Sequence, residues 1–272
     1  MSVINTNVKS LVAQNALTVN SRNLSKTMEQ LSTGKRINSA ADDAAGLAIS
    51  NKMTSQVKGL NQAVRNANDG ISMLQTAEGA TQEITNMLQR MRELAVQSAN
   101  DTYSADDRTA MGKEVTQLEA EITRIATSTK WNGMQVLNSA QEKTLQVGIS
   151  NSTDSDVTIN LQDMTATGLD VASLDLGSHT SAQAAMDKLD TAIGKVDSFR
   201  ADLGAKVNRL NYAADNLTNV SLNTSASRSR IADTDYAQAT TELARSQIIQ
   251  QAATAMLAQA NQQPSSVLSL LQ

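Results

Sequence analysis

The chain of 272 residues is 40% apolar but only 2% aromatic, and it contains a single proline, at position 264. A core of leucine, isoleucine, valine, methionine and alanine suits narrow helix–helix seams rather than a thick globular core. The net charge of −4 argues against a nucleic-acid partner, while the absence of cysteine and the single histidine exclude disulfides, thiolate metal sites and zinc motifs with two histidines.

Residues 3–33 have the apolar periodicity of an amphipathic helix. The apolar side carries Ile4, Val8, Leu11, Leu17, Leu24, Met28 and Leu31. Asn, Gln, Ser and Thr lie between them, instead of the Glu–Lys pairs that stabilise an isolated helix. Such a helix is marginal alone, so we expect it to need a partner.

A bent connector and a long helix follow. Gly34 and Ser39 interrupt the first helix, and Asp42 with Asp43 place negative charge where the second begins. From residue 44 to 99 the apolar residues alternate steps of four and three, which predicts a long helix built to lie against others. A shorter helix starts at Ser104 or Ala105 and ends before Trp131.

The middle of the chain changes to a period of two. Val157, Ile159 and Leu161 alternate with polar residues, as do Leu145, Val147 and Ile149, and a polar run separates the two groups. This pattern predicts a β-hairpin at about 144–161. Residues 162–181 have neither periodicity and are rich in Gly, Ser, Thr and Asp, so we expect a short irregular surface segment that tolerates insertion.

The helical pattern returns at Ala182 and keeps one seven-residue register to Ile231. After residues 233–235 comes a last amphipathic segment that includes Leu243, Ile248, Ile249, Ala253, Met256 and Leu257. Pro264 is expected to break or kink it before the apolar tail, which contains Leu268, Leu270 and Leu271.

The predicted fold is mainly α: a long antiparallel coiled-coil helical bundle with a small β-hairpin insert. The two terminal helices carry weaker apolar stripes than the long ones, and their exposed apolar faces would be an aggregation hazard in a monomer.

No catalytic, cofactor or metal site is predicted. Asp42-Asp43 and Asp106-Asp107 are interpreted as helix N-terminal charges, because no nucleophile or pocket is evident beside them. Asp154 and Asp156 lack the remaining ligands of a calcium loop, and His179 is expected to be a solvated surface residue.

No apolar run approaches the ~20 residues of a membrane span. The N-terminus MSVINTNVKS lacks the layout of a cleaved secretory signal. Both features suit a cytoplasmic protein, and equally a protein secreted by a route that uses no cleaved signal.

Several motifs at the two ends resemble those of bacterial flagellin. They cover roughly residues 1–137 and 186–272. The N-terminal motifs are MSVINTNV, LSTGKRINSAADDAAGLAIS, NDGISMLQTAEGA and LQRMRELAVQSAN, and the C-terminal ones are LGAKVNRL, SRIADTDYA and QANQQPSSVLSLL.

The resemblance implies a terminal assembly domain, residues 1–44 with 233–272, and an adjoining helical rod domain, residues 45–232. With so few residues left in the middle, the chain resembles a short form without outer domains. The implied function is a secreted structural subunit that self-polymerises into the flagellar filament for motility after export by the flagellar type III pathway. The implied partners are other copies of the chain, the flagellar secretion chaperone, the filament cap and hook-junction proteins, with no nucleic acid and no membrane.

The resemblance also assigns residues to two surfaces. The expected self-assembly residues are Ile4, Val8, Leu11, Leu17, Leu24, Leu31, Leu243, Ile249, Met256, Leu268, Leu270 and Leu271. The expected docking patch for the flagellin-sensing Toll-like receptor of animal hosts is formed by Gln89, Arg90, Leu94 and Glu114, with Leu94 as its exposed apolar centre. Charge and spacing alone would indicate only a solvated helix face there.

The same motifs and composition bear on three other functions. A hook–filament junction protein shares the terminal helices, although the full run of motifs at both ends favours the filament subunit. A protease-bearing member of the family is excluded, since the central segment is too short for a domain and one histidine cannot bind catalytic zinc. A membrane-active helix is disfavoured because the polar faces are not rich in Lys and Arg.

Overall fold

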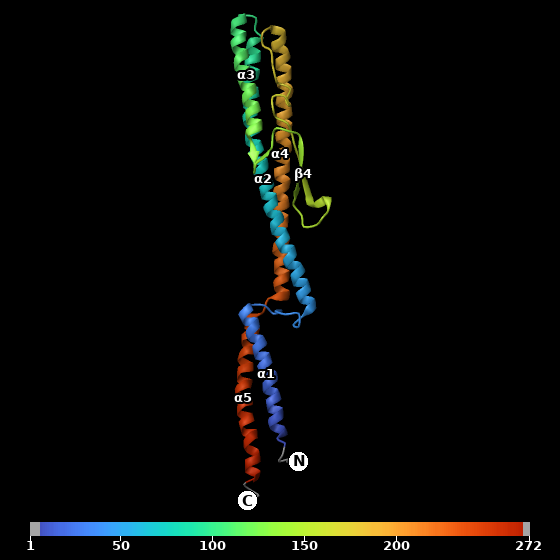
Figure 1. Cartoon of the computed structure of the whole chain (residues 1–272), viewed down its shortest axis with the longest axis vertical. Helices are drawn as coiled ribbons and strands as arrows, with labels where there is room; N and C mark the ends of the chain where they lie inside the picture. Colours follow the sequence, from blue (N-terminus) through green and yellow to red (C-terminus); the bar gives the residue numbers. More distant parts are fainter. Residues whose placement is uncertain (1–5, 269–272) are drawn as a thin grey trace. The chain divides into compact units, whose positions relative to one another are not determined.

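The structure is a computed structural model that describes the backbone of residues 6–268, and the side chains of that range apart from residues 153 and 263–268. Its helices are α1 (Val8–Thr33), α2 (Ala44–Ser98), α3 (Ala105–Ser128), α4 (His179–Ala232) and α5 (Tyr236–Leu268) (Figure 1). Its strands are β1 (Lys130–Trp131), β2 (Met134–Gln135), β3 (Gln141–Gln146) and β4 (Asp156–Leu161), with a 3-10 turn, η1 (Thr153–Ser155), before β4. The predicted mainly α bundle with a small hairpin is confirmed.

The chain forms two compact units. Unit 1 consists of residues 1–57 and 223–272, and unit 2 of residues 58–222. The division lies inside α2 and α4, whereas the predicted boundaries lie at the connectors, after residues 44 and 232.

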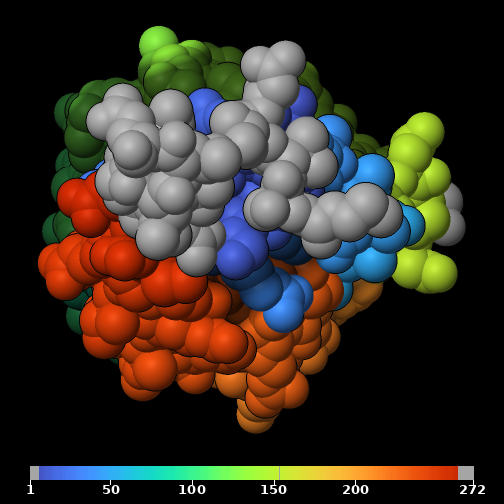
Figure 2. All heavy atoms as spheres, turned by 90° about the horizontal axis from the view of Figure 1, so that it is seen from below, coloured from blue at the N-terminus to red at the C-terminus, as the bar shows by residue number. Residues whose placement is uncertain are grey.

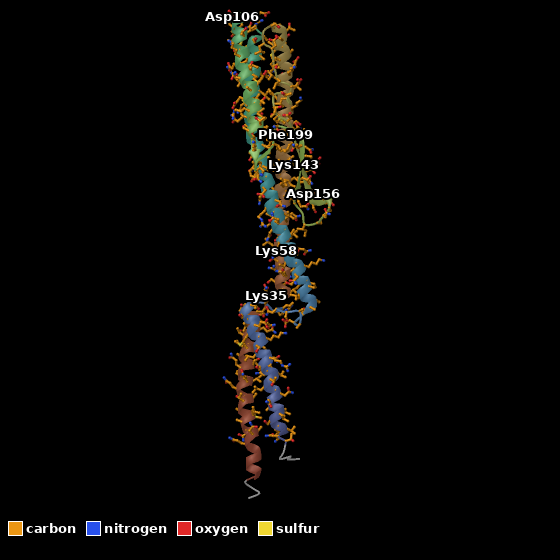
Figure 3. The ribbon with its side chains drawn as sticks, in the orientation of Figure 1. Lys35, Lys58, Asp106, Lys143, Asp156 and Phe199 are labelled. Atoms are coloured by element: carbon orange, nitrogen blue, oxygen red, sulfur yellow. The ribbon has the colours of Figure 1, made fainter. Side chains whose placement is uncertain are left out.

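Unit 2 has a core of side chains from α2, α3 and α4 together with the central segment. The apolar steps of three and four predicted on α2 put Leu74, Leu88 and Met91 at full burial. On α4 the chain's only phenylalanine, Phe199, is 1% exposed (Figure 3). The first turn of α3 carries Asp107 in a capping box with Ser104, as expected for a helix N-terminal charge.

The hairpin of unit 2 is an antiparallel pair that joins Gln141 to Leu161 and Gln146 to Asp156. It begins earlier than predicted, and Val147 and Ile149 lie beyond β3. The alternation was misleading there because Val147 already belongs to the turn, where its N–H donates to the Ser155 carbonyl over 2.8 Å.

A second hairpin, β1 with β2, was not predicted. Its turn is Asn132-Gly133, and both residues have positive φ, 45° and 79°. Asn-Gly is the dipeptide favoured in a two-residue turn of that type, so the signal was present in the sequence.

The central segment, residues 162–181, is irregular until α4 begins at His179, and most of its residues are exposed, but several of its apolar side chains anchor it in the core. Met164, Leu169, Val171 and Leu176 are buried. The N–H groups of residues 173 and 174 donate to the Glu119 carboxylate on α3 over 3.0 and 2.9 Å. The loss of periodicity hid these anchors because an irregular chain buries side chains at uneven intervals. The stretch 177–180 is exposed.

In unit 1, α1 and α5 lie side by side in opposite directions (Figure 1). Their facing positions recur in heptads: Ala13, Leu17, Asn20, Leu24, Thr27 and Leu31 on α1, and Ala239, Leu243, Ser246, Gln250, Ala253 and Leu257 on α5. The least exposed of them include Asn20 and Thr27 at 7% and Ser246 at 2%. Asn20 Nδ2 donates to the Ser246 carbonyl over 2.8 Å.

The expectation that Pro264 breaks α5 is wrong, because the helix continues to Leu268. Proline removes one helical N–H, and the carbonyl four residues earlier must then find another donor. The side-chain amide of Asn7 provides it, since Asn7 Nδ2 lies 2.8 Å from the Ala260 carbonyl oxygen.

The connectors of unit 1 pair with each other. Gly34 ends α1 in the left-handed conformation, with φ of 70°, a position that favours glycine. Its carbonyl accepts the N–H of Thr234 over 3.0 Å, and the N–H of Arg36 donates to the Ala232 carbonyl over 2.7 Å.

Asp42 organises the first connector. Its carboxylate lies 2.7 Å from Lys26 Nζ and accepts the N–H groups of Ser39 and Asn38 over 3.0 and 3.2 Å. Lys26 most strongly, and then these two N–H groups, hold the pKa of the Asp42 carboxyl well below its usual range. Asp43, rather than Asp42, caps α2, with Oδ1 accepting the Gly46 N–H over 2.9 Å.

The lowered pKa of Asp42 predicts how the pH affects stability. Because the native state favours the ionised form, the contribution is complete above the unfolded pKa of about 4 and declines as the pH falls below it. Asp42→Asn should therefore lower the free energy of unfolding by a constant amount between about pH 5 and 8. The difference from wild type should shrink below about pH 4, as measured by chemical denaturation. A difference that stays constant down to pH 2 would contradict this role of Asp42.

Candidate functional site: the outward face of the terminal helices

Helices α1 and α5 expose large apolar side chains among their polar ones. Eight of them are 42–67% exposed: Val8, Leu11, Val12, Val19 and Met28 on α1, and Ile248, Ile249 and Met256 on α5. In Figure 2 the atoms of α5 are drawn in red. We call these eight residues the outward face.

A groove of about 560 Å³ lies within the outward face, between the two helices of unit 1. Its lining is Val8, Lys9, Val12, Ala13 and Ala16 from α1, and Ala253, Met256, Gln259 and Ala260 from α5. Alanines form much of the wall, and their short side chains leave the space open. The groove is therefore open and mostly apolar.

The outward face and the seam divide the apolar residues in an unusual way. A stable two-helix coiled coil places large aliphatic side chains at its seam and polar ones outside. Here the buried seam positions include Asn20, Thr27 and Ser246, while valine, leucine, isoleucine and methionine face outward. Burial of one large aliphatic side chain contributes ~1.5–3 kcal/mol, so much of the apolar stabilisation available to these helices is unused within the unit.

The structure separates the expected assembly residues into two groups. Val8, Leu11, Ile249 and Met256 lie on the outward face. Leu17, Leu24, Leu31 and Leu243 are half-buried in the seam between α1 and α5. Ile4, Leu270, Leu271 and the side chain of Leu268 lie outside the described residues.

Sequence reasoning left Val12 and Val19 out of the apolar stripe, although both belong to the outward face. A signal for Val12 was present, because it follows Val8 by four residues and so shares its side of the helix.

The expected receptor patch is only partly exposed. Gln89, Arg90 and Glu114 face solvent, and Arg90 Nε lies 3.0 Å from Glu114 Oε1, joining α2 to α3. Glu114 first, and then Glu93, raises the pKa of Arg90.

Leu94 is 2% exposed, so the expectation that it forms the exposed apolar centre is wrong. Helix α2 is flanked on two sides, since Arg90 pairs with Glu114 on α3 and Arg92 pairs with Asp190 on α4. A helix between two partners needs a wider apolar stripe than a single seam, and Leu94 belongs to that wider stripe. Val96, at 48% exposure, is the nearby apolar residue that faces solvent.

The described residues contain no group of three or more His, Asp or Glu side chains placed to hold a metal ion. Within the same residues, no helix has the length and apolar character needed to cross a membrane. His179 is exposed, and its Nδ1 contacts the Ala99 carbonyl.

Comparison with known proteins agrees at both ends of the chain. The family model for the bacterial flagellin N-terminal helical region matches residues 4–142, and that for the C-terminal helical region matches residues 186–271. A flagellin from Halalkalibacterium halodurans is 46% identical over 270 residues, covering 99% of each chain. The flagellar filament 33 kDa core protein of Treponema phagedenis is 44% identical over 284 residues, again covering 99% of each.

Longer relatives and solved structures extend the comparison. Polar flagellin F of Vibrio parahaemolyticus is 39% identical over 372 aligned positions, covering 98% of this chain and 99% of its own, and is thus the longer protein. The crystal structure of Bacillus cereus flagellin matches with a TM-score of 0.49 and 34% identity, over 56% of this chain and 88% of that one. A flagellar hook-associated protein from Vibrio parahaemolyticus shares the fold at 13% identity, with a TM-score of 0.59 over 71% of this chain and all of that one.

Both family models and the full-length identity lead to one conclusion: the chain belongs to the bacterial flagellin family and is a short member of it.

Proposed function

We propose that the outward face of α1 and α5 is the surface through which copies of this chain polymerise. As a flagellin, the chain is a structural subunit of the bacterial flagellar filament, which lies outside the cell. Flagellins are a family of structural proteins, and the filament is a homopolymer.

One observation carries the proposal: eight large aliphatic side chains of unit 1 are exposed outside the seam, while the buried seam positions include the polar residues Asn20, Thr27 and Ser246. An isolated pair of helices gains little from that arrangement. A polymer gains from it, because neighbouring copies can cover the outward face and fill the groove between Val12 and Met256.

The same arrangement supports coupling of folding to assembly. Ordering each residue costs ~1–2 kcal/mol of backbone entropy, and a seam containing Asn20, Thr27 and Ser246 offsets little of it. In this proposal the terminal helices become fully ordered when neighbouring subunits cover them. A subunit of this kind suits export in an unfolded form through the flagellar type III pathway, with the secretion chaperone, filament cap and hook-junction proteins as its further partners.

The alternative, a hook–filament junction protein, is not favoured. The full-length relatives include flagellins and a filament core protein, whereas the hook-associated protein matches in fold alone. The number of copies per flagellum distinguishes a filament subunit from a junction protein, because a filament contains thousands of subunits and a junction contains about one ring of them.

A second proposal concerns recognition by an animal host. Gln89 and Arg90 lie on α2 within the segment that resembles the family's receptor-binding motif, and with Glu114 on the neighbouring α3 they form an exposed polar patch. We infer that this patch docks to the flagellin-sensing Toll-like receptor. Arginine with adjoining hydrogen-bonding groups is common at interface hot spots.

The assembly proposal predicts the effect of polar substitutions in the groove. Val12→Ser and Met256→Ser each remove an exposed aliphatic side chain, so the helical content of the monomer should be unchanged. The loss of burial against a neighbour, at ~1.5–3 kcal/mol per side chain, should raise the critical concentration for polymerisation by roughly tenfold or more. Sedimentation of polymer grown from seeds measures that concentration.

The control is Gln14→Ser, a change at an exposed polar position of α1 outside the groove. It should leave the critical concentration near that of wild type. Unchanged polymerisation by both Val12→Ser and Met256→Ser would refute the assignment of the outward face.

The receptor proposal predicts weaker signalling by a monomer that carries Arg90→Ala and Glu114→Ala. Both side chains are about half exposed, so circular dichroism should show the wild-type helical content. The matched control replaces another exposed ion pair of α3, Arg124 with Glu121, and should signal normally. Equal signalling by the two double variants would rule out the patch.

A further inference from the structure

The carbonyl of Ala260 lacks its usual helical partner. In an α-helix each carbonyl accepts the N–H of the residue four positions later, and for Ala260 that residue is Pro264, which has no N–H. Helix α5 nevertheless continues to Leu268. An unpaired backbone carbonyl inside a helix is costly unless another donor reaches it.

Asn7 is that donor. It lies just before α1, and its Nδ2 is 2.8 Å from the Ala260 oxygen although the two residues are 253 positions apart. Its Oδ1 accepts the N–H of Ser10 over 3.1 Å and so caps the start of α1. Ser10 adds a second bond to the same turn of α5, with its Oγ donating to Asn261 Oδ1 over 2.9 Å.

We propose that Asn7 replaces the amide hydrogen that Pro264 lacks, and that this pairing fixes the register of α1 against α5. One carboxamide performs both tasks: its oxygen caps one helix and its nitrogen completes the other. Aspartate would keep the cap and lose the donor, while alanine would lose both.

A register lock is needed because the seam specifies register weakly. Its leucines recur every seven residues on α1 and lie fourteen residues apart on α5, so a slip by one heptad would still bring leucines of the two helices together. After such a slip Asn7 would no longer face the carbonyl freed by Pro264. Polar contacts at single seam positions are a known means of selecting one register in coiled coils. The helical order of α5 beyond Pro264 then depends on α1 lying in the register that places Asn7 beside the Ala260 carbonyl.

Hydrogen exchange in a double-mutant cycle tests the proposal. The full-length chain is compared as wild type, Asn7→Asp, Pro264→Ala and the double variant, each assembled into polymer, and exchange is followed in the peptide 258–268 by mass spectrometry. Loss of one net hydrogen bond should speed exchange about fivefold in Asn7→Asp. When Pro264→Ala restores the helical N–H, the same Asn7→Asp change should have almost no effect.

Asn20→Asp is the matched control. Asn20 also donates to a carbonyl of α5, that of Ser246, but residue 250 is a glutamine with an N–H of its own. The effect of Asn20→Asp should therefore be the same with either residue at position 264. An effect of Asn7→Asp that is equally independent of position 264 would overturn the proposal.

A second readout applies if Asn7→Asp does not assemble. The double variant with Pro264→Ala should then recover polymer, and failure to recover it would overturn the proposal. The outward face is intact in all of these variants, so an error in the assignment of the assembly surface would not alter the comparison.

Discussion

The packing of α1 against α5 determines how stable unit 1 is. Helices of this length gain stability by burying aliphatic side chains along a shared seam, yet here Asn20, Thr27 and Ser246 occupy buried seam positions. Asn20 donates to the Ser246 carbonyl across the seam and Thr27 bonds within α1, and these polar residues add little hydrophobic stabilisation. The aliphatic side chains that could supply more hydrophobic stabilisation face outward. The two helices of unit 1 are therefore folded while much of their apolar surface stays exposed.

Unit 2, residues 58–222, differs because its large apolar side chains are buried within the unit. Its three long helices bury leucine, isoleucine, methionine and Phe199 almost completely, and the irregular central segment adds Met164, Leu169 and Val171. Such a unit can fold on its own contacts. The chain therefore combines a part whose apolar side chains are buried internally with a part that leaves large apolar side chains exposed, which is the surface we propose for assembly.

Periodicity in the sequence predicted the features that depend on regular spacing. The helices, the heptads of the seam and the strand containing Val157 follow from steps of seven, three to four, and two residues. Burial of Leu94 did not follow, because it depends on α2 having partners on two sides. The anchors of the central segment and the bond from Asn7 to Ala260 join positions with no regular spacing, so only a three-dimensional structure reveals them.

The most direct test of the account is a high-resolution electron cryomicroscopy structure of the filament assembled from this chain. The account predicts that the side chains of Val12 and Met256 lose their exposure to solvent in the filament because side chains of a neighbouring copy fill the groove. It also predicts that Asn20 and Ser246 remain paired within each subunit. A filament in which Val12 and Met256 stay exposed to solvent would contradict the claim that the outward face drives assembly.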